Sequence, residues 1–122
     1  MITRDMREVK SQQVKHWWSR VRQYTQLSER LSQATVNDLD RVQDIEQCIH
    51  TLNAQFRAVE QIPYPKSATH IRRALLAFLM NMITVMQHAR LENVDDRNVI
   101  FDIAKVDKNM VEIYLEEYGL SL

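Results

Sequence analysis

The chain contains one glycine and two prolines in 122 residues, and this scarcity constrains its fold more than any other feature. Gly119 lies near the C-terminus, and Pro63 and Pro65 lie close together in the middle. Tight hairpins and phosphate-binding loops depend on glycine for positive φ angles and close backbone approach. The sequence therefore excludes P-loop, dinucleotide-binding and β-rich folds, and it predicts an all-α protein with one sharp break.

Length and composition are typical of one globular domain covering residues 1–122. Hydrophobic residues make up 45% of the chain and charged residues 26%, which suffices for a buried core. Sixteen basic and sixteen acidic residues cancel, so no overall field favours nucleic acid or an anionic membrane. No apolar run approaches the ~18 residues of a membrane-spanning helix. We expect neither nucleic-acid binding nor membrane insertion.

Apolar residues recur at steps of three and four along the first half of the chain, which predicts two helices over about 2–34 and 36–61. Thr35 with Asp38 resembles a helix cap, and Asn37 is an alternative cap. Neither glycine nor proline separates the two segments. One continuous helix over residues 2–61 is therefore the alternative.

The stretch from Ile62 to Pro65 ends the second helix, because each proline lacks an N–H and disfavours α geometry in the residue before it. Two more helices are predicted over about 65–92 and 94–118, the last ended by Gly119. The stripe expected to face inward on the last helix consists of Val99, Ile103, Val106, Met110 and Ile113. Short connections favour a four-helix antiparallel up-down-up-down bundle with a long first helix.

Two histidines have acidic neighbours four residues away on the same helix face: Glu46 with His50, and His88 with Glu92. A fold at Pro63 and Tyr64 would separate the two pairs by about ten residues, or ~15 Å along the helix axis. Asp102 adds one more carboxylate but no second histidine. We therefore expect no metal site, no cofactor and no catalytic residues.

Helix one carries an aromatic concentration at Trp17 and Trp18, with basic residues on both sides. Aromatic and basic side chains together bind nucleic acid or a protein partner, whereas buried tryptophans simply pack the core. We expect Trp17 in the core and leave Trp18 open between the two roles. Cys48 lies among apolar residues and has no activating base nearby, so an inert, buried thiol is expected.

Four features of the sequence form a combined pattern. They are a helix ending at Ile62 to Pro65, His70 soon after it, a long leucine-rich helix, and a last helix closing with Leu115, Gly119 and Leu120. Over residues 36–120 this pattern resembles small uncharacterised bacterial domains of secreted or lipid-anchored type. The resemblance implies a helical bundle and carries no known activity. It also implies an extracytoplasmic location, provided that a signal or anchor precedes these residues in the natural protein.

The sequence thus favours a non-enzymatic helical bundle that acts as a structural or protein-interaction module. The alternative is a ligand-sensing bundle that holds an apolar molecule between the third and fourth helices, where methionines gather. Residues 1–12 are expected to form a projecting helix or a linker, because the apolar stripe is sparse there. Ile2, Met6, Val9 and Trp18 are the residues expected to contact a protein partner or a second copy of the chain.

Overall fold

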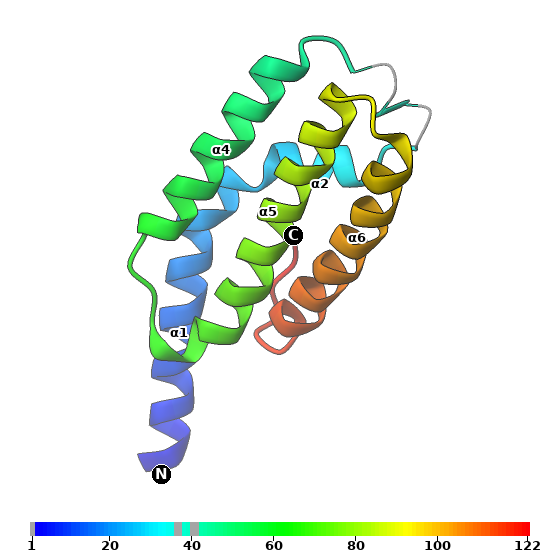
Figure 1. The fold of residues 1–122 in the computed structure, drawn as a ribbon. Coiled ribbons are helices and arrows are strands. Elements are labelled where there is room, and N and C mark those ends of the chain that lie inside the picture. Colours follow the sequence, from blue (N-terminus) through cyan, green and yellow to red (C-terminus); the bar gives the residue numbers. More distant parts are fainter. Residues whose placement is uncertain (1, 36–37, 40–41) are drawn as a thin grey trace.

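The computed structural model describes residues 2–35, 38–39 and 42–122, with side chains from residue 6 onward. Within these ranges all regular secondary structure is helical, which confirms the all-α prediction (Figure 1). The elements are α1 (Ile2–Val21), η1 (Arg22–Tyr24), α2 (Gln26–Ser32), α4 (Ile45–Gln61), η2 (Lys66–Ala68), α5 (Thr69–Arg90) and α6 (Val94–Glu116), where η marks a 3₁₀ turn.

The prediction of a long first helix over residues 2–34 is wrong, and so is the alternative of one helix over 2–61. The chain leaves α geometry after Val21, and α2 then turns away from the axis of α1 (Figure 1). At the break, the hydroxyl of the buried Thr25 donates a 2.8 Å hydrogen bond to the Arg22 carbonyl, which also accepts the Thr25 N–H at 3.1 Å. A threonine hydroxyl that bonds backbone three residues earlier favours a 3₁₀ turn over a continued α-helix.

The second helix begins later than the periodicity predicts, at Ile45. The predicted capping bonds between Thr35 and Asp38 are present, although they do not begin α4: the Thr35 hydroxyl accepts the Asp38 N–H at 3.2 Å, and the Asp38 carboxylate accepts the Thr35 N–H at 3.0 Å. Asn37, the alternative cap, lies outside the described residues. The cap that starts α4 is Asp44, whose backbone is left-handed (φ 57°) and whose carboxylate accepts the Gln47 N–H at 3.3 Å. Aspartate is among the few residues that tolerate this conformation.

The predicted antiparallel hairpin around Pro63 and Pro65 is confirmed. At its closed end, Arg72 of α5 donates a 3.1 Å hydrogen bond to the carbonyl of Glu60 in α4. At its open end, Arg90 forms an ion pair with Glu46, with a nitrogen–oxygen distance of 3.3 Å. The start of α5 therefore contacts the end of α4, and the end of α5 contacts the start of α4. The two helices run in opposite directions.

Helices α5 and α6 are also antiparallel, and α5 lies between α4 and α6 (Figure 1). Asn81 bonds Asp107 midway along the pair, while His70 near the start of α5 lies 3.8 Å from the Glu117 carboxylate beyond the end of α6. The core formed by these helices and α1 is apolar and fully buried. Its largest members include Trp17, Leu52, Ile71, Leu75, Phe78, Met82, Met86, Phe101 and Leu115.

The C-terminal segment folds back onto α1. Gly119 has a φ of 69°, and the Leu120 N–H donates to the Leu115 carbonyl at 3.0 Å, so the predicted glycine-terminated helix end is confirmed. The turn directs the last residues across the molecule, where the carbonyl of Ser121 accepts the indole N–H of Trp18 at 3.2 Å. This contact joins the first helix of the chain to its C-terminal segment.

Candidate interaction surface

Helix α6 carries two apolar stripes on opposite faces, and the structure buries the one that the periodicity did not select. The buried stripe contains Phe101, Ala104, Val111 and Leu115, each at most 1% exposed. Its positions are offset by two residues from those of the stripe expected to face inward. An offset of two residues corresponds to a rotation of ~200° around the helix axis. The inward orientation predicted for the stripe from Val99 to Ile113 is therefore wrong.

Polar residues within the buried stripe explain why it is hard to recognise. Arg97 lies on the same face and is buried, with its guanidinium donating to the Asn98 side-chain oxygen at 3.0 and 3.1 Å. Lys108 also occupies this face and is half-buried. The steps 97, 101, 104, 108, 111 and 115 alternate between four and three, as do those of the other stripe, so spacing alone does not identify the buried face.

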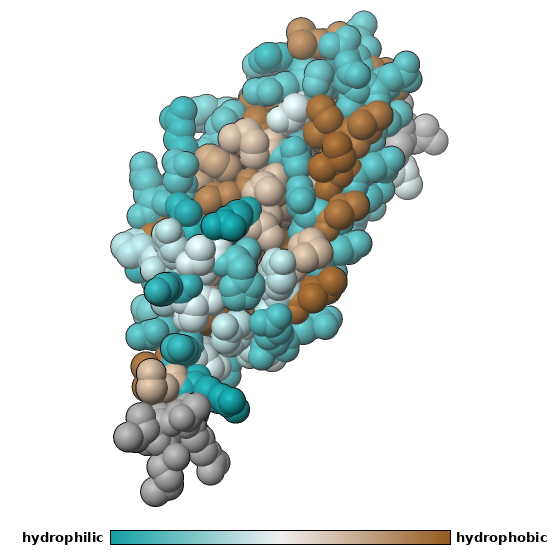
Figure 2. All heavy atoms as spheres, turned by 60° about the horizontal axis from the view of Figure 1, so that its bottom comes forward, coloured by the Kyte–Doolittle hydropathy of each residue, from teal (hydrophilic) through white to brown (hydrophobic). Residues whose placement is uncertain are grey.

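The other stripe forms an exposed apolar row along α6. Val99, Ile103, Val106 and Ile113 are between 49% and 62% exposed, and Met110 between them is half-buried. Figure 2 shows hydrophobic side chains in a row on the side of the molecule where α6 lies, bordered by hydrophilic ones. We call Val99, Ile103, Val106, Met110 and Ile113 the α6 stripe. Its spacing of four, three, four and three is that of a helix–helix seam.

Acidic residues border the α6 stripe. On a helical projection, every charged residue of α6 within about 100° of the stripe centre is acidic. These residues are Asp95, Asp96, Asp102, Asp107 and Glu116. The basic residues of α6 lie on the remaining part of its circumference, where Lys105 packs 4.3 Å above the Phe101 ring. The surface is therefore an apolar row with a negative rim.

The N-terminal part of α1 is a second exposed surface. Gln13 and His16 lie beside the turn of Pro63 and Pro65, and the residues of α1 before Gln13 extend past that turn (Figure 1). Helix length is not the cause, because α1 has 20 residues and α6 has 23. α1 simply begins beyond the end of the neighbouring helices.

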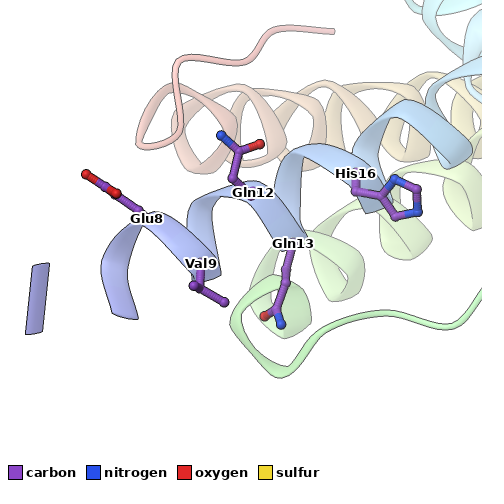
Figure 3. A pocket seen from close by; sticks show the side chains of 5 residues that line it. All are labelled: Glu8, Val9, Gln12, Gln13 and His16. Atoms are coloured by element: carbon purple, nitrogen blue, oxygen red, sulfur yellow. The ribbon is translucent and has the colours of Figure 1, made fainter. Parts of the chain in front are cut away.

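Two of the expected contact residues are exposed on this projecting part: Met6 is 53% and Val9 55% exposed. The side chain of Ile2 lies outside those described. A shallow hollow of about 570 Å³ runs along the same helix and is lined by Glu8, Val9, Gln12, Gln13 and His16 (Figure 3). Since all five come from α1, this hollow is an open trough on one helix.

Trp18, the fourth expected contact residue, is buried in the structure rather than exposed. It is only 2% exposed, because the C-terminal segment covers it and accepts its indole N–H. Trp17 is buried to the same extent, as expected, and the two rings lie 6.2 Å apart. Neither tryptophan presents a ring face for stacking against a base or a partner.

The register used to separate the two histidine–carboxylate pairs is also wrong. A fold at Pro63 and Tyr64 would place Arg90 opposite position 37, whereas its partner is Glu46. The connection between the helices includes η2 and runs from Ile62 to Ala68, which shifts α5 relative to α4. Even so, no group of three or more His, Cys, Asp or Glu side chains suited to a metal ion occurs among the described residues.

Cys48 is half-buried on α4 rather than fully buried. Loss of solvent raises the pKa of its thiol; Arg30 opposes this effect by lowering the pKa, and Asp44 adds to it. The nearby His50 is exposed, and no hydrogen bond between it and Cys48 is present. The thiol is therefore held in its neutral, weakly nucleophilic form.

No family model, curated protein or solved structure matches this chain. In the part of the chain that the structure describes, none of the helices is both long and apolar enough to cross a membrane.

Proposed function

We propose that this chain is a non-enzymatic protein-interaction module that docks a helix of its partner on the α6 stripe. In this proposal α1, α4, α5 and α6 form one antiparallel four-helix bundle, which acts as a rigid support for the stripe. The exposed row from Val99 to Ile113 is the observation that carries the proposal. A helix that is apolar on two opposite faces is expected to be covered on both.

The energetics favour a covered stripe. Fully burying a valine or isoleucine side chain is worth about 1.5–3 kcal/mol. Because four members of the stripe are already half-covered, docking a partner would add roughly 1 kcal/mol for each, or about 4 kcal/mol together. The buried stripe anchors α6 to the core through residues that include Phe101 and Leu115. Folding therefore leaves the exposed stripe available for a partner.

The alternative of an apolar ligand between α5 and α6 has less support. Met82 and Met86, which would line such a site, are fully buried and fill the core. Met80 is instead 44% exposed on the outside of α5. These methionines therefore pack the protein or lie on its surface.

Site-specific photo-crosslinking tests the proposal. A benzophenone amino acid replaces Val106 in one variant and the exposed Arg57 of α4 in a matched control, and both are irradiated in the cells that produce the protein naturally. We expect a discrete protein adduct from position 106 and none from position 57. Equal labelling from both positions, or none from either, would refute the proposed docking face.

A further inference from the structure

We infer that the occupant of the α6 stripe is the projecting part of α1, residues 2–12, from a second copy of this chain. This inference rests on the proposed function and names the partner. It joins two surfaces that are exposed in the described structure, the α6 stripe and the projecting part of α1. Four observations support it: charge, residue spacing, length and the trough along α1.

Charge argues against pairing of two α6 helices and in favour of α1. Helix α6 contains six acidic and three basic residues, and every charged residue of α6 that borders its stripe is acidic. Two such rims facing each other would repel. Residues 2–12 of α1 contain three basic and two acidic residues, α1 as a whole contains five and two, and Arg7 and Lys10 are both exposed next to its apolar positions. The two helices therefore carry opposite net charges.

Spacing and length also agree. Met6 and Val9 are three residues apart, and Ile2 precedes Met6 by four in the sequence, which matches the alternating steps of the α6 stripe. Residues 2–12 span about 16 Å as a helix, and the stripe from Val99 to Ile113 spans about 21 Å. One projecting segment therefore covers most of one stripe.

The trough on α1 is complementary in spacing to the side chains of the α6 stripe. Val9, Gln13 and His16 lie along it at steps of four and three, and Gln12 borders it (Figure 3). A ridge of valine and isoleucine side chains with the same steps fits a trough of this kind, as ridges fit grooves between packed helices. The contact would extend toward the turn at Pro63 and Pro65, where a further hollow of about 300 Å³ adjoins Gln13 and His16.

Two such contacts are expected in each assembly. A single contact between one three-turn segment and one stripe is small compared with the ~1,000 Å² or more of a stable interface. If each copy both gives its α1 and receives the other's, the area doubles and the assembly closes as a two-fold dimer. A reciprocal dimer also leaves no unpaired stripe from which a filament could grow.

Sedimentation of the full chain from about 1 to 200 μM tests the inference. We expect a monomer–dimer equilibrium whose Kd rises with salt, because opposite charges contribute. Val106→Lys and Val9→Lys should each raise the Kd at least tenfold, since each places a charge in the contact. Ala54→Lys, at an exposed position of α4, adds the same charge elsewhere and should leave the Kd unchanged. Circular dichroism checks that all three variants remain folded.

Crosslinking then identifies which surfaces meet. Chains with Val9→Cys and chains with Val106→Cys, both carrying Cys48→Ser, are mixed and oxidised. We expect disulfide dimers chiefly between the two kinds of chain. Dimers formed mainly between two Val106→Cys chains would overturn the inference and show that α6 pairs with itself.

The inference and the proposed function fail separately. A chain that stays monomeric at every concentration overturns the second copy as the occupant. If position 106 nevertheless gives a discrete adduct with another protein in the photo-crosslinking experiment, the docking function stands with a different partner. If neither dimers nor adducts form, both are refuted.

Discussion

The side-chain amide of Asn81 in α5 donates a 2.6 Å hydrogen bond to the carboxylate of Asp107 in α6. This side-chain contact joins the two helices near their midpoints, and both residues are half-buried. Because its partner is charged, the bond is stronger than a neutral one. It also fixes how far α5 and α6 are shifted along each other.

We expect Asn81→Ala to lower the free energy of unfolding by about 1 kcal/mol, since the site retains some access to water. Urea denaturation of the single variants Asn81→Ala and Asp107→Ala and of the double variant measures the coupling between the two residues. A coupling of about 1 kcal/mol is expected. Strictly additive effects of the single substitutions would show that the bond contributes nothing to stability.

The hydrogen bond from Trp18 to Ser121 predicts that the last residues shield this indole from water. In a Trp17→Phe background, Trp18 is the only tryptophan and its fluorescence reports on that site alone. Removing residues 120–122 should shift its emission to longer wavelength and increase quenching by acrylamide. Removing only Leu122, which makes Ser121 the C-terminus and leaves it a carboxylate oxygen to accept the bond, is the control. Unchanged emission in the longer truncation would contradict the contact.

The raised pKa of Cys48 predicts slow alkylation of the folded protein. Iodoacetamide should react more slowly at pH 8 with the native chain than with the chain in urea, because the thiolate is the nucleophile. Cys48 is the only cysteine, so total alkylation measures this site. Equal rates in the native and unfolded chains would show that burial does not protect the thiol.

The raised pKa of Cys48 also determines how the stability of the fold changes with pH. Folding favours the neutral thiol, so its contribution is complete below the unfolded pKa and is lost as pH rises through the higher pKa of the folded state. Relative to Cys48→Ala, the native chain should therefore lose stability only in alkaline solution. Thermal unfolding of both chains across that pH range provides the comparison.

The sequence predicted the elements that depend on local chemistry. Pro63 and Pro65 remove backbone donors, so the hairpin between α4 and α5 follows from covalent structure. Gly119 similarly marks the end of the last helix. The break at Thr25 could not be read from the sequence, because a threonine in a helical pattern has several alternatives and its hydroxyl bond is decided by packing. The left-handed Asp44 likewise has no unique local signal.

The candidate site could be predicted only in part, for a reason specific to α6. Val106 and Ala104 belong to two stripes of equal period, and periodicity alone does not say which stripe faces the core. Total hydrophobicity favours the stripe of Val106, since the other contains Arg97 and Lys108. The choice depends on the large Phe101 and Leu115 side chains, which fill space against the other helices and are buried.

The orientation of α6 predicts that lysine substitutions on its two faces change stability by different amounts, so that each substitution is a control for the other. Ala104 is fully buried, whereas Val106, two residues later, is 62% exposed. Ala104→Lys would force a long charged side chain into space occupied by one methyl group, so we expect a loss of at least ~3 kcal/mol. Val106→Lys should change stability by less than ~1 kcal/mol, because its side chain reaches water.

Chemical denaturation at a concentration where the chain is monomeric measures both effects without a contribution from association. The two variants carry the same added charge on the same helix, so differences in helix propensity and net charge are small. If Val106→Lys were the more destabilising of the two, α6 would be turned by about half a revolution from the orientation described. The exposed stripe, and the docking surface built on it, would then be part of the core.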